Sequence, residues 1–162
     1  MIALTGHQLQ HWTNHTTANW KRLIAAHPQI LTFPCSIRET QNVAQLLQHI
    51  VAVELRYAEL LNDRPQTSYD DIPYHSADAL FATHDSAMRL LTPLLDRDDA
   101  FWDFMLEMQT RSAGVLCATR RTVFVHLHTH SIRHYAQLAT ISRTHGIPPD
   151  WYSDYILLPP AS

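Results

Sequence analysis

Apolar side chains recur along most of this chain at intervals of three and four residues, which is the spacing of amphipathic α-helices. The pattern predicts helices over residues 5–27, 37–62, 77–95 and 119–146. Pro28 follows the first helix, and Gly146 suits the left-handed conformation that ends the last one. Alternating strand-type runs are few, so the pattern predicts an all-α fold.

The segments between the predicted helices carry their own signals. Ser36 and Glu39 have the spacing of a capping box, which predicts that the second helix begins directly after Ser36. Residues 62–75 carry two prolines and predict a long crossover, whereas residues 96–118 predict a small hairpin or irregular excursion before the last helix. Together these features predict one four-helix-bundle domain over residues 1–162.

The last predicted helix carries histidines in its core-facing stripe. The apolar members of this stripe are Val123, Leu127, Leu138 and Ile141. His130 and His134 lie inside the stripe, and His126 lies at its edge. His128 points about 160° away from His130, outside the stripe. Because buried polar groups cost free energy unless they find partners, this histidine pair indicates a hydrogen-bonding or metal-binding role.

Helix geometry limits which of these histidines can share one metal ion. Residues four apart are separated by about 6 Å along the axis, so their imidazoles can converge on one ion. His126 and His134 are separated by about 12 Å and cannot both reach the same ion from a straight helix. The spacing allows His126 with His130, or His130 with His134, and does not choose between them.

Other ligand-type residues compete with this helix. His7, His11 and His15 repeat every four residues but lie about 150° from the apolar face of the first helix, which predicts a solvated row that binds metal only adventitiously. His84 has no ligand-type residue three or four positions away, which predicts a surface histidine. Glu54 is turned about 140° from the histidine five residues before it, which predicts an ion-pairing surface residue.

Composition narrows the function classes. A chain of 162 residues is long enough for one domain with a substantial core. A net charge of −3 and a pI near 6.4 argue against a partner such as nucleic acid or an anionic membrane. Cys35 and Cys117 have no metal-type spacing and fit a reducing compartment. Without a signal-peptide core or a membrane-length apolar run, the chain is predicted to be cytoplasmic.

Short motifs along the chain are similar to those of one known family. They are Ser36-Ile37-Arg38-Glu39-Thr40, His49-Ile50-Val51-Ala52-Val53-Glu54, His130-x-x-x-His134-Tyr135-Ala136-Gln137-Leu138-Ala139-Thr140, and then Gly146, Pro148-Pro149 and Asp154-Tyr155. Together with Asn14 and Ala18-Asn19, they span nearly the whole chain in order. This arrangement resembles the DinB-like family of metal-binding four-helix bundles.

The resemblance implies a metal site made of His49, His130 and His134. The family motif reads roughly H-x-x-x-H-R-x-Q, and its second histidine aligns with His134 because Gln137 follows three residues later. Tyr135 stands where the family usually has arginine, so the contribution of that arginine is missing here.

The resemblance also implies roles for residues around the ligands. His126 becomes a residue that lines the pocket one turn before His130. Gln137 is placed to orient a ligand imidazole or a bound water, or to form a buried hydrogen bond to a neighbouring helix. Arg56, on the same helix row as His49, is placed to meet an anionic substrate or to form a surface ion pair.

Three neutral imidazoles with an open coordination position are typical of a catalytic metal site. Imidazole suits zinc, nickel and iron, so the resemblance implies a divalent metal without fixing its identity. Characterised relatives include thiol-dependent transferases and isomerases, which implies an enzyme that positions a low-molecular-weight thiol for attack on a small electrophile. The alternatives are a metal-dependent hydrolase, a non-catalytic metal-binding stress or sensor protein, and a helical interaction module. No catalytic carboxylate is evident near the ligands, which favours thiol chemistry over hydrolysis.

The last predicted helix has a second apolar strip, which bears on assembly. Its members are Val125, Ile132, Ala136 and Ala139. A helix that is apolar on two sides is buried on two sides. Either a partner subunit, or the 96–118 excursion and the C-terminal tail, can cover this strip, and we expect a homodimer.

Overall fold

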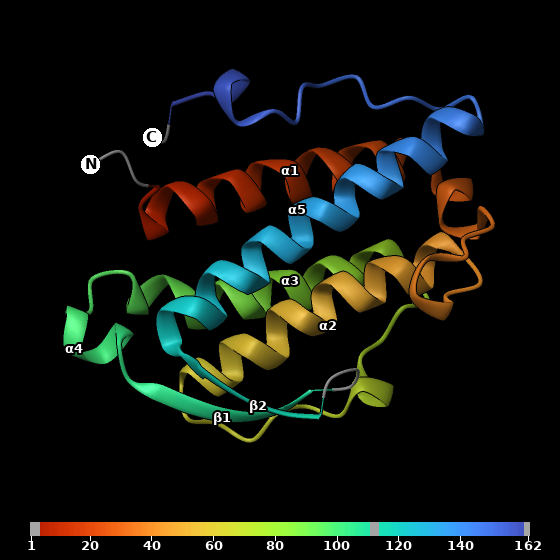
Figure 1. Cartoon of the computed structure of the whole chain (residues 1–162). Helices are drawn as coiled ribbons and strands as arrows, with labels where there is room; N and C mark the ends of the chain where they lie inside the picture. Colours follow the sequence, from red (N-terminus) through yellow and green to blue (C-terminus); the bar gives the residue numbers. More distant parts are fainter. Residues whose placement is uncertain (1–3, 111–113, 161–162) are drawn as a thin grey trace.

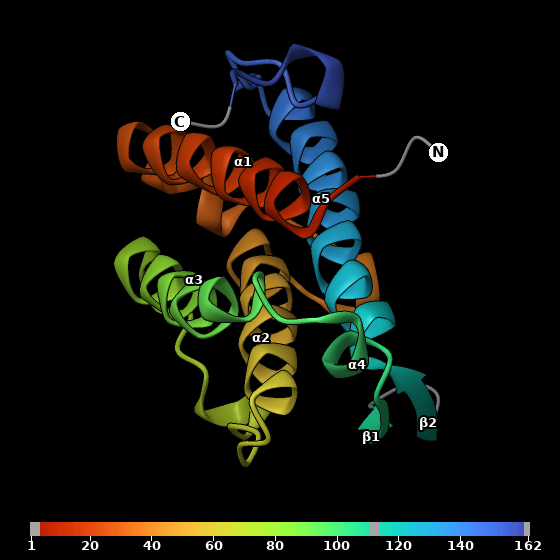
Figure 2. The ribbon, with the colours of Figure 1, turned by 90° about the vertical axis from the view of Figure 1, so that its left-hand side faces the viewer.

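The computed structural model describes residues 4–110 and 114–160 (Figure 1). In these ranges the long helices are α1 (Gly6–Ala26), α2 (Val43–Leu61), α3 (Ala77–Leu91) and α5 (Arg120–Thr144), and α4 (Asp99–Trp102) is a single turn. α2 packs against α3 and α5, while α1 packs against α5 and α3 (Figures 1 and 2). The prediction of a helical fold is confirmed.

The helix ends show which local signals in the sequence were decisive. Thr5 and Gln8 form a reciprocal capping box at the start of α1. The Ser76 hydroxyl accepts a hydrogen bond from the backbone N–H of Ala79 at the start of α3. Pro93 ends α3 in a short 3₁₀ turn, because proline cannot donate the hydrogen bond that would continue the helix.

The prediction that α2 begins directly after Ser36 is wrong. Residues 37–39 form a 3₁₀ turn in which Arg38 and Glu39 have φ angles of 55° and 65°, a conformation that cannot propagate a right-handed helix. α2 begins at Val43 instead, where the side chain of Asn42 caps it by accepting from the backbone N–H of Gln45. The displaced loop carries Arg38 toward the middle of α5, with consequences for the site described below.

The excursion before the last helix is a hairpin, one of the two predicted alternatives. Strands β1 (Met105–Thr110) and β2 (Gly114–Thr119) pair antiparallel, with Leu106 opposite Ala118. Leu106 and Met108 are buried in the core, so one face of β1 is anchored to the helices. Residues 111–113, which come between the two strands in the sequence, lie outside the described residues.

α5 ends as its sequence predicts. Gly146 has a φ of 78°, and its N–H and that of Ile147 bond to the carbonyls of Arg143 and Ser142 in a Schellman arrangement. The tail then returns along α1 (Figure 1), where the ring of Trp151 packs edge-on against Trp20.

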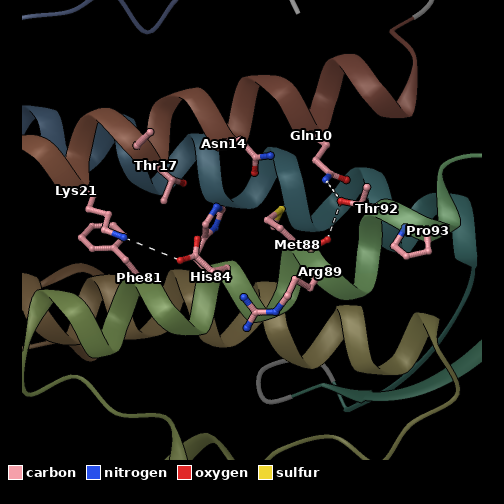
Figure 3. Close-up of a pocket in the computed structure, with 12 residues that line it drawn as sticks. Gln10, Asn14, Thr17, Lys21, Phe81, His84, Met88, Arg89, Thr92 and Pro93 are labelled. Carbon is pink, nitrogen blue, oxygen red and sulfur yellow. Dashed lines mark hydrogen bonds and ion pairs between the residues drawn. The ribbon is translucent and has the colours of Figure 1, made fainter. Parts of the chain in front are cut away.

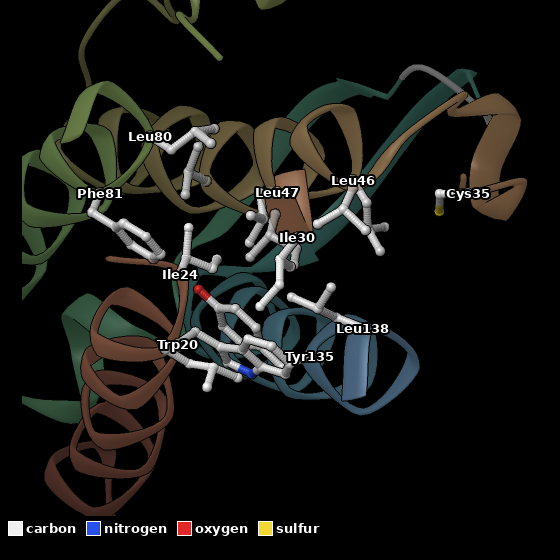
Figure 4. Close-up of a cluster of buried hydrophobic side chains, with 14 of the residues drawn as sticks. Trp20, Ile24, Ile30, Cys35, Leu46, Leu47, Leu80, Phe81, Tyr135 and Leu138 are labelled. Carbon is white, nitrogen blue, oxygen red and sulfur yellow. The ribbon is translucent and has the colours of Figure 1, made fainter. Parts of the chain in front are cut away.

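Buried apolar residues form two clusters stacked along the helices. One cluster contains Trp20, Leu46, Phe81 and Tyr135, among others (Figure 4), and the other lies toward the opposite ends of the same helices around Leu61, Leu91 and Phe124. Between the clusters, each long helix contributes buried polar side chains. We call Thr13, Glu54, His84, His128 and Ser131 the polar layer.

No helix in the described ranges is both long enough and apolar enough to span a membrane.

Candidate metal centre

The structure brings His49 of α2 together with His130 and His134 of α5. One ring nitrogen from each of the three side chains lies within 4.8 Å of the other two. The Nε2 atoms of His49 and His130 are 3.1 Å apart. Nitrogens bound at about 2 Å to one tetrahedral ion are separated by roughly 3.3 Å, so this spacing fits a shared divalent ion.

Hydrogen bonds assign the ring nitrogen that His134 can offer to a metal. Its Nδ1 lies 2.7 Å from Oε1 of Gln137, an oxygen that can only accept, so Nδ1 carries the proton. Its Nε2 lies 3.2 Å from a guanidinium nitrogen of Arg133, a group that can only donate. Nε2 therefore has the free electron pair that coordination requires, and Gln137 fixes this tautomer.

The electrostatic setting favours the neutral imidazoles of His130 and His134. Burial, together with the neighbouring His134, His49, His126 and Arg133, lowers the pKa of His130 to about 2. Burial also lowers the pKa of His134, although its bond to Gln137 acts the other way. Because a metal binds the unprotonated imidazole, protons compete weakly for this site near neutral pH.

A cavity of about 640 Å³ opens onto the three histidines. It is lined by Ile37, Arg38, Val53, Tyr57, Thr110, Leu116, His126, Arg133 and Gln137 together with the three histidines. Thr110 and Leu116 come from the hairpin, so the excursion before α5 forms one wall of the cavity. An ion held by the three histidines would face a cavity large enough for a small organic molecule.

The predicted pocket residue His126 lies in this cavity, one turn before His130. Its ring is 5.6 Å from that of His130 and 5.8 Å from that of Tyr57, measured between centroids. Partial burial and the nearby Arg133 lower the pKa of His126, so its imidazole is neutral at pH 7. Its ring lies beside the three-histidine group and is not a member of that group.

Charged side chains in the cavity are all cationic. Arg38 and Arg133 line it, and no aspartate or glutamate is among the lining residues that the structure describes. Arg56 lies in an adjoining cavity of about 510 Å³ that shares His49, Val53, Tyr57 and Thr110 with the first. Arg56 donates a hydrogen bond to the carbonyl of Thr67, and within the described ranges it forms no ion pair.

Two predictions about neighbouring residues are wrong. Glu54, predicted at the surface, is fully buried, and His84, also predicted at the surface, is only 5% exposed. The Nδ1 atom of His84 lies 2.7 Å from one carboxylate oxygen of Glu54, and Ser131 donates to the other oxygen at 2.7 Å. The surface prediction for His84 rests on the lack of a ligand-type neighbour, although His84 lies in the apolar stripe of α3 between Leu80, Phe81, Ala87 and Met88. Glu54 is buried because α2 packs against both α3 and α5, so a second side of α2 is also covered.

The remaining histidines also differ in part from their predicted surroundings. His128, predicted outside the core stripe, is fully buried because α1 covers that side of α5, and its Nδ1 lies 2.8 Å from the hydroxyl oxygen of Thr13. His7 is exposed as predicted, whereas His11 and His15 are half-buried and the C-terminal tail reaches His11 through the carbonyl of Pro159. Within the described residues, this row does not form a three-ligand group.

Sequence reasoning missed Arg38, Arg133 and the hairpin residues as components of the site. Arg133 could have been noticed because it directly precedes His134 on the same helix. Arg38 could not, since its position depends on the left-handed turn that displaces the start of α2. Helix periodicity also carries no information on where a hairpin will fold.

Comparison with known proteins agrees with this geometry. The sequence model of the DinB superfamily matches residues 8–138, a span that includes all three histidines and Gln137. No curated protein matches the chain. Because the match covers far more than half of the 162 residues, this chain belongs to the DinB superfamily.

Proposed function

We propose that His49, His130 and His134 bind one divalent metal ion and that the loaded site transfers a low-molecular-weight thiol to an anionic electrophile. The observation that carries this proposal is the convergence of three imidazole nitrogens, at ligand spacing, on an open cavity lined by arginines. Such an ion would supply Lewis-acid chemistry, which favours loss of the proton from a thiol or water beside it. Zinc, nickel and iron all accept imidazole ligands.

Arg133 connects the metal to the substrate in this proposal. Its guanidinium donates to Nε2 of His134, the nitrogen that the ion would take. With Nε2 of His134 engaged by an ion, this guanidinium would be free to face the cavity together with Arg38. Guanidinium groups pair with carboxylates in a bidentate manner, so the two arginines select an anionic substrate and orient it beside the histidines.

Proton transfer falls to His126. Its neutral imidazole lies at the cavity beside His130 and can accept the proton that the thiol gives up. In the transfer, the thiol sulfur forms a bond to the electrophilic carbon, the leaving group departs with its electron pair, and the thiol proton resides on His126 before it reaches solvent.

Thiol transfer is preferred to hydrolysis because of the charges in the cavity. Metal hydrolases that activate water commonly use a carboxylate as general base, and none is among the described lining residues. Glu54, a buried carboxylate five residues after His49 on α2, is hydrogen-bonded to His84 and Ser131 instead. A non-catalytic metal-binding sensor is the second candidate, because the same three histidines suffice for it.

The test uses an aryl chloride that carries a carboxylate, 4-chloro-3-nitrobenzoate, with its methyl ester as the neutral match. We expect zinc-, nickel- or iron-loaded protein to catalyse chloride release with bacillithiol, mycothiol or glutathione, and to prefer the carboxylate over the ester. Arg133→Gln is expected to reduce that preference about tenfold, whereas Arg64→Gln, an exposed arginine outside the cavity, preserves it. Equal rates of chloride release with and without metal would overturn the enzymatic proposal. The non-catalytic metal-binding sensor would then be the remaining candidate.

We also propose that the long helices form a four-helix bundle and that the protein is a homodimer. The C-terminal tail covers part of the second apolar strip of α5, since Trp151 and Ile132 line the same small cavity. Val125 remains 40% exposed, and Ile156 on the tail is 87% exposed. Light scattering is expected to give twice 18.6 kDa, and a single species at 18.6 kDa would contradict the dimer.

A further inference from the structure

A second cavity, of about 770 Å³, lies between α1 and α3 and shares no lining residue with the histidine cavity (Figure 3). From α1 it is lined by a polar stripe that includes Gln10, Asn14 and Lys21. From α3 it is lined by apolar Phe81 and Met88 among charged neighbours. The two walls therefore combine an apolar surface with polar groups, as small-molecule sites do.

His84 connects this cavity to the polar layer. In Figure 3 its ring extends from α3 toward α1, while Nδ1 is bonded to the fully buried Glu54. Burial alone lowers the pKa of His84, but the charge of Glu54 and its hydrogen bond outweigh burial, and the pKa is raised. Asp85 raises it further, while Lys21 acts against it.

α5 also contributes a histidine to the surroundings of His84, and this histidine is neutral. On α5, burial lowers the pKa of His128 to about 3, so its imidazole carries no charge near pH 7. The raised pKa favours the imidazolium form of His84, in which both ring nitrogens carry a proton. Because Nδ1 is paired with Glu54, the proton on Nε2 is the one available to a ligand in the cavity.

A second cation belongs to the same cavity. Arg89 lines it and is exposed, and its guanidinium donates to the Ser86 hydroxyl at 2.8 Å. Within the described ranges Arg89 has no carboxylate partner, whereas Lys21 lies 4.0 Å from Asp85. Three cationic side chains, Lys21, His84 and Arg89, thus line the cavity against one carboxylate, Asp85, and this excess of positive charge attracts an anion.

Among the residues that the structure describes, two amide oxygens on α1 have no hydrogen-bond partner. The hydroxyl of Thr92 donates to the Met88 carbonyl at 2.9 Å, so it must accept from Nε2 of Gln10 at 2.7 Å. This fixes the orientation of the Gln10 amide and leaves its Oε1 as a buried acceptor without a partner, on a side chain only 6% exposed. Oδ1 of Asn14 is buried and unpartnered in the same way. Buried acceptors of this kind gain from any donor that reaches them.

We propose that the α1–α3 cavity binds a small organic acid that has an apolar body and a hydrogen-bond-donating substituent. The carboxylate pairs with Nε2–H of His84 and, after the exposed Arg89 side chain turns from its bond to Ser86 toward α1 (Figure 3), with the guanidinium of Arg89. The donor, a hydroxyl or an amine, meets the unpartnered amide oxygen of Gln10 after a small rotation of that side chain. The apolar body lies against Phe81 and Met88. This site is independent of the metal centre.

The test is isothermal titration calorimetry of zinc-loaded full-length protein with 2-hydroxyhexanoate. We expect Arg89→Gln to weaken binding about tenfold and Arg64→Gln to leave it unchanged. His130→Gln, which disables the metal centre, is expected to change the affinity less than about twofold. No binding at millimolar concentration, equal affinity in Arg89→Gln, or loss of binding in His130→Gln would each overturn the proposal.

Matched ligands test the two recognition elements separately. Hexanoate lacks the donor and is expected to bind about fivefold more weakly than 2-hydroxyhexanoate, a difference that Gln10→Leu removes. 1,2-Hexanediol lacks the carboxylate and is expected to show no binding. In ¹H–¹⁵N spectra of the histidine rings, 2-hydroxyhexanoate is expected to shift the resonances of His84 and not those of His130. Tight binding of the diol, or a response confined to His130, would contradict the site.

Discussion

His130, which faces α2 from α5, and His84, which faces Glu54 from α3, are buried to nearly the same degree, at 6% and 5% exposed. Their pKa values nevertheless move in opposite directions. His130 has three other histidines and Arg133 around it, so nothing offsets the cost of burying a charge and its pKa falls to about 2. His84 has one carboxylate at hydrogen-bond distance, and its pKa rises.

The difference separates two uses of a buried histidine. Neutral imidazoles that converge without a carboxylate retain the electron pairs that a cation needs. A charged imidazole paired with a buried carboxylate forms a fixed internal ion pair and offers its second N–H to a cavity. Burial alone therefore does not tell whether a histidine can be a metal ligand. The charges of the neighbouring side chains do.

Breaking the ion pair is expected to produce the largest effect. Glu54→Gln leaves His84 without its counter-charge and weakens the acceptor of Ser131 inside the polar layer. We expect the free energy of unfolding to fall by about 3 kcal/mol in urea denaturation. The exposed Glu107→Gln is the control, with an expected change below about 0.5 kcal/mol. Equal stability of the two variants would mean that the pair is not formed.

Removing one imidazole from the other group is expected to abolish tight metal binding. His130→Gln should weaken zinc affinity at least about 100-fold, measured by competition with a chromophoric chelator, because it removes a direct ligand. Replacing His7, His11 and His15 together with Gln is the control and should retain one tightly bound ion per chain. The reverse pattern would place the site on α1.

The pH dependence of stability is expected to distinguish the two environments. In metal-free protein, His128 and His130 have pKa values of about 3 and about 2 in the folded state, compared with 6.5 in the unfolded state. Below pH 6.5 the unfolded state therefore binds protons that the folded state does not. Stability should therefore fall with acidification by about 1.4 kcal/mol per pH unit for each histidine, and His130→Gln should remove one such contribution.

His84 is expected to act with the opposite sign. The stabilisation that protonated His84 gives to the folded state is fully present below pH 6.5. It is lost as the pH rises through the raised pKa of His84 in the folded state. His84→Gln should therefore flatten the alkaline side of the stability profile, while His130→Gln changes only the acidic side. Urea titrations across this pH range measure both, and identical profiles for the two variants would contradict the assigned charges.

The smallest expected effect concerns the residue that sets the tautomer of His134. Gln137→Leu removes the acceptor of the Nδ1 proton and should weaken metal affinity about tenfold. Gln137→Glu keeps an acceptor and should weaken it less. If Leu and Glu at this position behaved alike, the hydrogen bond would have no part in metal binding.

The sequence predicted the features that depend on local periodicity. The four long helices, the cap at Ser76, the Gly146 terminus and the placement of His130 and His134 on one face all follow from spacing along a single helix. The identification of His49 required resemblance to a family, because residue spacing along α5 cannot show which residue of α2 lies opposite His130 and His134.

The features that the sequence did not predict arise where elements meet. Glu54 becomes buried because α2 packs on two neighbours, and His84, which lies in the apolar stripe of α3, finds its carboxylate partner on another helix. Arg38 reaches the cavity through a left-handed turn that a capping-box pattern concealed. Charged residues that pair across helices are thus the least visible part of a site in a single sequence.

The most direct test of the metal centre is an anomalous difference map from crystals of the zinc-loaded protein. One peak is expected within about 2.2 Å of Nε2 of His49, His130 and His134, with at least one further coordination position open toward the cavity. A peak coordinated by His126 and His130 with His134 free, or a peak on the α1 row with none at His130, would contradict the account.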